Sequence, residues 1–463
     1  MVKMETIVII LLFFATVRGL GIKDVVVVVL SQQNGHHLRI AENLKKDLLE
    51  QADGLQGKPV VHLSHRDFPH VGDWTILPLI PQLYDLHKDN SSWLVFVEDR
   101  TRIRLKKLHK VLQKYDPNKP VWLGHALHDT EPTIIHHYAF YDDPKKFKYP
   151  NVASGTAISG ALLQRLAARL RQRDAPRSDF GIDNGHELAL FVWDKGVGEV
   201  LTDEPALCVQ EEDFCAAFPA PFRQCGEPVE NESIFFAVKT CGKYHEERVP
   251  VVKRTWARHA TRIQFFSDVE DGTIPTVDLG VPNTERGHCG KTMAILHHIK
   301  KKLKDQPDIK WVVVADDDTI LGVSRVQKLL SCYNSTESVA LGERYGYNVR
   351  SPEGYNYITG GGGMVFSGAL LKQLTRPGVC KCPSISAPDD MFLGLCIASL
   401  GVTITHSPLF HQARPVDYPP QYLQTKDAVS FHKHWMIDPE SVYDQWFAQE
   451  DAQQSTIYTH SEL

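Results

Sequence analysis

The chain carries one sequence plan twice, and this internal repeat limits its fold more than any other feature. The segment Ser92–Arg100 matches Lys310–Asp318, since in each a Trp-led apolar run ends in charged residues. Further along, Ser159–Leu166 matches Ser367–Leu374. Matching blocks in the same order predict two homologous domains. We expect them at residues 24–200 and 230–445, joined by a cysteine-bearing linker at 201–229 and followed by a polar tail at 446–463.

Each repeat begins with an apolar run typical of a strand buried on both faces. Val25–Leu30 opens the first repeat and Ile234–Val238 the second. Such runs occur in largely parallel sheets covered by helices on both sides. The sequence therefore predicts the α/β class, with a mostly parallel sheet flanked by helices in each domain. Ligands of such sheets bind beyond the carboxyl ends of the strands, here after Val97 and Ala315.

The first 19 residues resemble a secretory signal peptide. Lys3 precedes an apolar run, Ile7–Val17, that is too short to cross a bilayer, and we expect cleavage near Gly19. A buried N-terminal helix is the alternative. The last four residues, His460–Leu463, resemble the signals that the retrieval receptor of the endoplasmic reticulum reads. Together these ends predict a soluble protein retained in that lumen, without a transmembrane span. Three sequons would be open to glycosylation there if exposed: Asn90, Asn231 and Asn334.

The cysteines fit the same compartment. Nine cysteines in an oxidising lumen favour disulfides over zinc sites, because their spacings lack paired Cys-x-x-Cys halves. The odd number leaves at least one thiol unpaired. The cysteines that we expect to cross-link irregular segments are Cys208, Cys215, Cys225, Cys380 and Cys382.

Acidic residues gather at two places in the second repeat. The whole chain has 51 basic and 56 acidic residues, a net charge of −5, which gives no electrostatic reason to bind nucleic acid. Asp316–Asp318 follows a predicted strand, where three adjacent carboxylates repel one another unless a cation is present. A divalent metal and a solvated acidic turn are the two interpretations. Alternation along an extended backbone sends Asp317 to the side opposite Asp316 and Asp318.

The second acidic pair, Asp389-Asp390, precedes an apolar stretch and is typical of a helix start. Capping explains one of these carboxylates, and the other is a candidate general base. Four glycines, Gly360–Gly363, stand between apolar segments, where the backbone must bend sharply or lie against a ligand. His411 follows a short predicted strand, but its residue type alone does not distinguish a ligand from a structural donor.

Four motifs in one order resemble the Fringe-like β-1,3-glycosyltransferases of glycosyltransferase family 31. They are the Asp triplet, Thr359–Gly363, Pro388–Asp390 and Pro408–His411, and the likeness extends over residues 232–435. The resemblance implies two tandem glycosyltransferase A-like domains and a UDP-sugar donor. Within the family, the duplicated first half and the retrieval-like tail resemble members that transfer glucose from UDP-glucose, in β-1,3 linkage, to O-linked fucose on thrombospondin type 1 repeats.

The same resemblance implies roles for single residues. Asp318 and His411 would bind Mn²⁺, for which carboxylate and imidazole ligands are suited. Asp390 would be the general base that deprotonates the acceptor hydroxyl, and the anomeric centre would invert without a covalent intermediate. The donor-binding residues would be Asp268, Asp316, Asp317, Gly361, Gly362 and Gly363.

The first repeat departs from these motifs. Arg100 stands where the second repeat has Asp318, Asn184 replaces Asp390, and Ala153–Thr156 replaces the glycine run. Arginine puts a fixed positive charge at the cation's position, and asparagine cannot act as a base. We therefore expect a degenerate, non-catalytic first domain. Two alternatives remain for the whole protein: transfer of galactose or N-acetylglucosamine, and a non-catalytic luminal lectin or folding factor.

Overall fold

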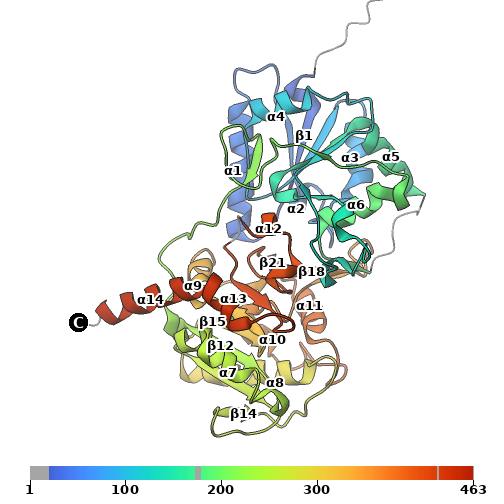
Figure 1. Cartoon of the computed structure of the whole chain (residues 1–463). Coiled ribbons are helices and arrows are strands. Elements are labelled where there is room, and N and C mark those ends of the chain that lie inside the picture. The colour runs from blue at the N-terminus through green and yellow to red at the C-terminus, as the bar shows by residue number, and fades with distance from the viewer. Residues whose placement is uncertain (1–19, 173–178, 425–426, 462–463) are drawn as a thin grey trace, which may run out of the picture.

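The computed structural model describes residues 20–172, 179–424 and 427–461, and it contains two α/β units that follow one another in the chain (Figure 1). The amino-terminal unit lies at the top of Figure 1 and the carboxy-terminal unit at the bottom. The expected signal peptide and the last two residues of the retrieval-like tail lie outside the described residues. Within the described part of the chain, no helix is both long enough and apolar enough to cross a membrane.

The amino-terminal unit is built on a six-stranded sheet. Its central strand β1 (Val25–Leu30) pairs in parallel with β2 and β3, and β8 runs antiparallel between β3 and β5. Val26 and Val28 of β1 enter the core on one face, whereas Val25, Val27 and Val29 enter the core on the other. The sheet order is β2 (Val60–Leu63), β1, β3 (Trp93–Glu98), β8 (Thr156–Ser159), β5 (Trp122–Gly124) and β10 (Thr202–Asp203).

The carboxy-terminal unit repeats this plan in a seven-stranded sheet. All six strands of the first sheet have a counterpart here with the same order and relative direction. The predicted fold class, two tandem α/β domains with parallel-rich sheets flanked by helices, is therefore confirmed. The sheet order is β14 (Thr276–Asp278), β13 (Ile263–Ser267), β12 (Ile234–Lys239), β15 (Trp311–Asp316), β20 (Met364–Ser367), β17 (Ala340–Gly342) and β21 (Ile404–His406).

Helices cover both faces of each sheet, because their apolar side chains complete the two cores that alternate strand residues begin. In the first unit α1 (Gly35–Gln51) and α4 (Leu105–Leu112) cover one face, and α3 (Ile80–His87), α5 (Gly160–Arg171) and α6 (Asn184–Trp193) cover the other. In the second unit α7 (Val249–Arg254) and α9 (Val323–Leu330) lie opposite α8 (Cys289–Asp305), α10 (Gly368–Leu374) and α11 (Asp389–Ser399).

Backbone and side-chain hydrogen bonds join the two units. The short strand β9 (Phe180–Gly181) of the first unit pairs with β18 (Arg344–Tyr347) of the second, which also pairs with β19 (Tyr355–Ile358). Just after β1, the Gln32 amide donates to the His406 carbonyl (3.1 Å) and accepts from the His406 N–H (2.7 Å). These bonds hold the carboxyl ends of the first sheet against the second unit.

The segment expected as a linker, residues 201–229, is partly built into the first unit. Strand β10 extends the six-stranded sheet, and β11 (Ala217–Pro219) pairs with β4 (Thr101–Ile103). A disulfide between Cys225 and Cys332 then attaches the end of the segment to the second unit. Only the part after β11 therefore runs between the two units.

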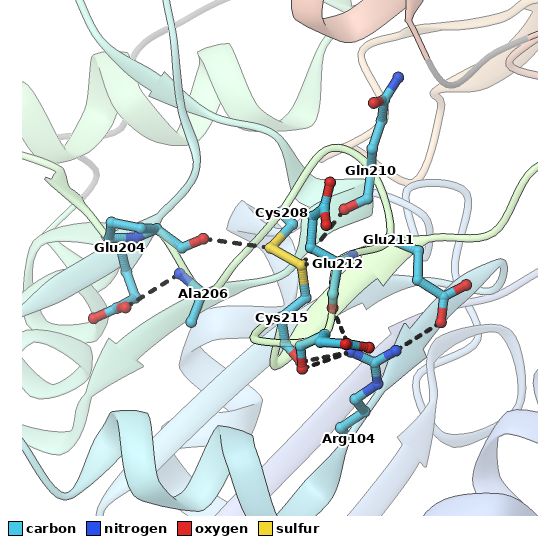
Figure 2. The surroundings of a disulfide bond; sticks show 10 residues. Arg104, Glu204, Ala206, Cys208, Gln210, Glu211, Glu212 and Cys215 are labelled. Carbon is cyan, nitrogen blue, oxygen red and sulfur yellow. Dashed lines mark hydrogen bonds and ion pairs between the residues drawn. A yellow bond between two sulfur atoms is a disulfide. The ribbon is translucent and has the colours of Figure 1, made fainter.

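A small disulfide loop precedes β11 (Figure 2). Cys208 and Cys215 are bonded across 7 residues, and the Arg104 guanidinium binds the loop from the side. It donates to the main-chain carbonyl of Glu212 and to the carboxylate of Glu211 (2.6 Å) (Figure 2). A guanidinium that donates in several directions fixes a loop with little regular structure of its own.

The expectation of disulfides is confirmed. Besides the two bonds already described, Cys289 pairs with Cys382 and Cys380 with Cys396. These two bonds tie α8 and α11 to the irregular segment that leads into α11. Cys241, buried at the end of β12, is the free thiol among the described cysteines.

Most of the carboxy-terminal segment expected as a polar tail is helical. Helix α14 (Ala448–Ser461) leaves the second unit sideways in Figure 1. At its base, the buried Asp451 carboxylate accepts hydrogen bonds from the backbone N–H of Ser324 (2.7 Å) and Val323 (3.3 Å), which lie in the first turn of α9. The Tyr443 hydroxyl donates to the same carboxylate at 2.9 Å. Asp451 thus caps α9 from a distant part of the sequence.

We predict that Asp451→Ala lowers the thermal unfolding midpoint, because it leaves N–H groups of α9 and a buried tyrosine hydroxyl unpaired. The expected cost is about 1–3 kcal/mol. Gln453→Ala, an exposed position on the same helix, is the control. Equal midpoints for the two variants would contradict the capping role.

Candidate active site

Two acidic motifs and a buried lysine meet at the carboxyl edge of the seven-stranded sheet. Parallel pairing of β12 with β15 sets Lys239 opposite Asp316 at the strand ends. Lys239 Nζ lies 3.0 Å from Asp316 Oδ1 and 2.7 Å from Oδ2 of Asp389, the first residue of α11. Thr292 Oγ1 donates a further hydrogen bond to Asp389 (2.6 Å). The lysine therefore joins two carboxylates that are far apart in the sequence.

This ion pair fixes the charge of its members. Burial opposes the charge of Lys239, but the Asp316 and Asp389 carboxylates outweigh that effect and raise the lysine pKa. Burial alone would raise the pKa of Asp389, but the lysine charge and the hydrogen bonds from Lys239 and Thr292 lower it to about 2. Asp389 is therefore ionised at neutral pH and engaged in the ion pair, which makes it a poor proton acceptor.

Three potential metal ligands converge beside the ion pair. One oxygen each of Asp316 and Asp318 and one ring nitrogen of His432 lie within 4.8 Å of one another. The histidine stands on β22 (Ser430–His432), which is brought beside the triplet by antiparallel pairing with β16 (Thr319–Leu321). His432 Nε2 is 3.2 Å from Asp318 Oδ1 and 3.9 Å from Asp316 Oδ2. Two carboxylates and an imidazole form a donor set that fits a divalent cation such as Mn²⁺.

The opposite charges at these ligands offset one another. Burial opposes ionisation of Asp318, but the hydrogen bond and charge of His432, together with the Arg248 charge, hold its pKa well below the usual range. Burial likewise opposes protonation of His432, yet the Asp318 hydrogen bond and carboxylate charges raise its pKa. Arg248 Nη1 lies 2.9 Å from Asp318 Oδ2. Protein cations thus already neutralise this carboxylate where a metal would do so.

Asp317 is not one of the three converging ligands, although Arg248 Nη1 contacts both its carboxylate and that of Asp318. The Asp317 carboxylate accepts hydrogen bonds from Thr240 Oγ1 (2.7 Å) and Arg248 (3.0 Å). Burial and the neighbouring Asp318 charge raise the pKa of Asp317 to about 6, against the lowering effect of those hydrogen bonds. Asp317 therefore positions Arg248 and the end of β12 in this structure.

His411, the histidine that the resemblance assigns to the metal, lies outside the three-ligand cluster. Its ring is 1% exposed and packs against Phe431 and the edge of Tyr418, with ring centres 4.9 and 4.8 Å apart. Its Nδ1 is 3.1 Å from the Ser430 carbonyl oxygen. Sequence reasoning missed His432, because a histidine in a three-residue strand carries no motif of its own. The metal role of His411 stays a prediction, and the geometry favours His432.

The glycine run passes directly behind the ligand cluster. A Cβ on Gly361 would clash with the imidazole of His432, so the close approach of this histidine requires glycine at that position. The Gly361 carbonyl accepts a hydrogen bond from Thr319 Oγ1 (2.9 Å), and the Gly362 N–H donates to Gln412 Oε1 (3.0 Å). Gly363 has a φ of +98°, which strongly favours glycine. At least part of the run thus serves the packing of the site itself.

Asp390 is a carboxylate whose pKa, like that of Asp317, is raised towards neutral pH. It follows Asp389 in the first turn of α11 and lies beside Gly360, and its Oδ1 accepts a hydrogen bond from the Met391 N–H (2.7 Å). Burial, and next the Asp389 charge, raise its pKa to about 6. A half-buried carboxylate of this kind is ionised at neutral pH and can still accept a proton.

A cleft of about 1240 Å³, counting its open mouth, lies in front of the acidic triplet. Its walls combine the carboxylates with cationic side chains from several elements, a mixture suited to a nucleoside diphosphate held with a metal. Asp268, at the end of β13, accepts a hydrogen bond from the Gly242 N–H (3.0 Å) but is not part of this lining. The cations that line the cleft are Lys239, Lys243, Arg248 and Lys291.

The same positions of the first unit hold different groups. Leu30 and Glu98 stand opposite each other at the strand ends where the second unit has Lys239 and Asp316. The next carboxylate, Asp99, is paired with His37 (2.7 Å). The two units therefore share a scaffold but not the buried lysine that organises the second site.

Comparison with known proteins identifies the family of the chain. The sequence profile of the Fringe-like family matches residues 80–180 and 229–460. The chain is 51% identical over 437 residues to a human β-1,3-glucosyltransferase, covering 94% of this chain and 87% of the relative. A mouse β-1,3-glucosyltransferase is 49% identical over 448 residues, with coverage of 96% and 91%.

More distant relatives match a smaller part of this chain. The β-1,3-N-acetylglucosaminyltransferase lunatic fringe of Bos taurus is 28% identical over 211 residues, covering 41% of this chain and 56% of the relative. A solved structure of a glycosyltransferase involved in glycosylation of the major capsid of PBCV-1 aligns with 46% of this chain and 98% of its own chain, at 12% sequence identity. The TM-score of 0.29 is too low to show a common fold. The family profile and the two glucosyltransferases extend over most of the sequence. The chain therefore belongs to the Fringe-like family of β-1,3-glycosyltransferases.

Proposed function

We propose that the protein transfers glucose from UDP-glucose, in β-1,3 linkage and with inversion, to O-linked fucose on thrombospondin type 1 repeats. The observation that carries the reaction is the convergence of Asp316, Asp318 and His432, and Lys239 joins this cluster to Asp389, the residue before Asp390. The choice of glucose is supported by relatives named as glucosyltransferases that align along nearly the whole chain. The fucosylated acceptor follows from the sequence resemblance.

In this proposal different residues of the second unit bind the metal, position the carboxylates and accept the proton. Asp316, Asp318 and His432 would hold Mn²⁺, which when bound offsets the negative charge that develops on the departing diphosphate. Lys239 keeps the carboxylates in place. Asp390 accepts the proton of the acceptor hydroxyl at a carboxylate oxygen as that hydroxyl attacks the anomeric carbon. Attack from the face opposite the leaving group inverts the α-linked donor to a β-linked product.

The first unit and the chain ends complete the proposal. Arg100 and Asn184 at the positions of Asp318 and Asp390 make catalysis by the first unit chemically unfavourable, so one active site per chain is proposed. A signal peptide and a carboxy-terminal signal for the retrieval receptor would keep the enzyme in the lumen of the endoplasmic reticulum, where its glycoprotein acceptors fold.

The direct test is transfer by the purified luminal protein, with Mn²⁺, from a panel of UDP-sugars to a folded O-fucosylated thrombospondin repeat. We expect product from UDP-glucose and its loss on chelation. Product from UDP-galactose or UDP-N-acetylglucosamine instead would change the donor but keep the enzyme class. Absence of turnover with every donor would contradict the proposal.

We predict that Asp390→Asn lowers kcat by about 10²- to 10⁴-fold, because it removes the general base. The affinity for UDP should be kept, because the substitution does not alter the residues that line the cleft. In the wild-type enzyme the base must be ionised. Since the pKa of Asp390 is raised to about 6, kcat/KM should rise with pH through that value and fall on its acidic side. Retained turnover in Asp390→Asn would rule out this base, and an unchanged unfolding midpoint is the control for its fold.

We predict that His432→Ala weakens Mn²⁺ binding by at least about a hundredfold, since even residues that only support a metal ligand change affinity by ~10–100-fold. Titration of Mn²⁺, followed by the electron paramagnetic resonance of the free ion, measures this without turnover. His411→Ala should lower the unfolding midpoint, because its ring is packed between aromatic rings, but keep the metal affinity. The reverse pattern of affinities would restore His411 as the ligand.

A further inference from the structure

Arg248 stands between the candidate metal ligands and the cleft in front of the acidic triplet. It directly precedes α7 and lines the cleft, and its side chain is 25% exposed. Its Nη1 lies 3.0 Å from Asp317 Oδ1 and 2.9 Å from Asp318 Oδ2, so one nitrogen serves two carboxylates. The guanidinium also lies over the ring of Tyr244, 3.7 Å from the ring centre. These contacts hold the guanidinium at the edge of the ligand cluster.

Both carboxylate oxygens of Asp318 are engaged by protein groups. Arg248 Nη1 lies beside Oδ2, and His432 Nε2 is 3.2 Å from Oδ1. A divalent cation bound by Asp316, Asp318 and His432 would therefore share Asp318 with the guanidinium charge. Like charges at such short range repel one another, and solvent ions screen the repulsion little where the groups are largely buried. A guanidinium that stays on Asp318 is therefore an electrostatic competitor of the metal.

The other two nitrogens of Arg248 are available to a ligand of the cleft. Nε and Nη2 form no hydrogen bond with the described residues, and neither is among the buried polar atoms that lack a partner. A guanidinium donates in several directions and suits phosphate oxygens. Arg248 can therefore bind a diphosphate in the cleft from the position in which it contacts the acidic triplet.

The other cations of the cleft are placed differently. Lys239 contacts Asp316, but its side chain is 6% exposed and is bridged to Asp389. Lys291 Nζ donates to the main-chain carbonyl just after β12 (2.7 Å). Lys243 lines the cleft but has no ion pair with the triplet in the described part of the chain. Within the described residues, Arg248 thus combines a contact with a metal ligand and nitrogens that remain available in the cleft.

We propose that Arg248 makes metal binding and nucleotide binding depend on each other. In the protein without ligands, the Arg248 charge neutralises Asp318 and weakens the metal site. When a nucleoside diphosphate enters the cleft, Arg248 donates to its phosphate oxygens, its charge is offset there, and Asp318 becomes available to the metal. The inference rests on the proposed function, because it takes a UDP-sugar as the ligand of the cleft. Coupling between two ligands is reciprocal, so the metal must raise nucleotide affinity by the same factor.

The test measures binding alone, with the purified full-length protein, Mn²⁺ and UDP. The electron paramagnetic resonance of free Mn²⁺ gives the metal affinity without nucleotide and with saturating UDP, and the ratio of the two affinities is the coupling factor. A titration without protein corrects for Mn²⁺ bound by UDP itself. Calorimetric titration of UDP, with and without Mn²⁺, gives the same factor from the nucleotide side.

Arg248→Gln removes the charge and keeps a polar side chain. We expect it to raise the Mn²⁺ affinity of the nucleotide-free protein by about fivefold or more and to lower the coupling factor by about tenfold, changes within the usual range of such coupling. If Arg248 only held the carboxylates in place, the same variant would lower the Mn²⁺ affinity, because the ligands would lose their support. The direction of the change therefore separates competition from support.

Two matched variants and one measurement of folding are the controls. Lys243→Gln removes an equal charge from the same cleft without touching the triplet, so it should weaken UDP binding and leave the nucleotide-free Mn²⁺ affinity within about twofold. Arg248→Lys keeps the charge, so its Mn²⁺ affinity should lie closer to that of the wild type than to that of Arg248→Gln. The unfolding midpoints of all three variants, compared with the wild type, show that the affinities are those of folded protein.

A lowered or unchanged Mn²⁺ affinity of Arg248→Gln, or a coupling factor equal to that of the wild type, would overturn the inference. Equal Mn²⁺ affinities of Arg248→Lys and Arg248→Gln would contradict it as well, because charge would then not be the cause. These results would leave the transfer test of the proposed function unaffected. Absence of UDP binding to the wild-type protein would instead contradict the proposed function together with the inference, so the two failures are distinguishable.

Discussion

The candidate active site depends on one buried cation, Lys239, that two carboxylates from different parts of the sequence must share. Asp316 comes from the neighbouring strand and Asp389 from the start of α11, and both lie within 3.0 Å of its Nζ. Leaving one member of a buried ion pair without its partner costs about 3–5 kcal/mol. This cost fixes the distance between the strand edge and the helix, and with it the separation between the converging ligands and Asp390.

The same constraint divides the roles of two adjacent aspartates. Asp389 is held ionised by Lys239 and Thr292, so its charge is constant near neutral pH. That charge, after burial itself, raises the pKa of Asp390 to about 6. One carboxylate thus keeps a constant charge and raises the pKa of its neighbour, a division that arises because their environments push the two pKa values apart.

Duplication gave the protein a cavity at the strand ends of each unit, and the two cavities differ in chemistry. In the second unit a lysine-bridged acidic edge faces a cationic cleft, whereas in the first unit histidines pair with the acidic residues and aromatic rings line the wall. The shared strand order is compatible with both kinds of lining. A fold of this type therefore keeps a concave site at its strand ends even where the catalytic groups have been replaced.

The sequence by itself determined the repeat, the α/β class, the positions of β1, β12 and β15, and the acidic motifs at the strand ends, because these follow from periodicity and from local residue order. It also indicated that the cysteines form disulfides. Only the tertiary structure decided which cysteines pair, that Lys239 joins Asp316 to Asp389, and that His432 rather than His411 lies beside Asp318. The physical reason is that these contacts link residues separated by tens to hundreds of positions. Strand pairing such as that of β16 with β22 creates them, and no local pattern records such pairing.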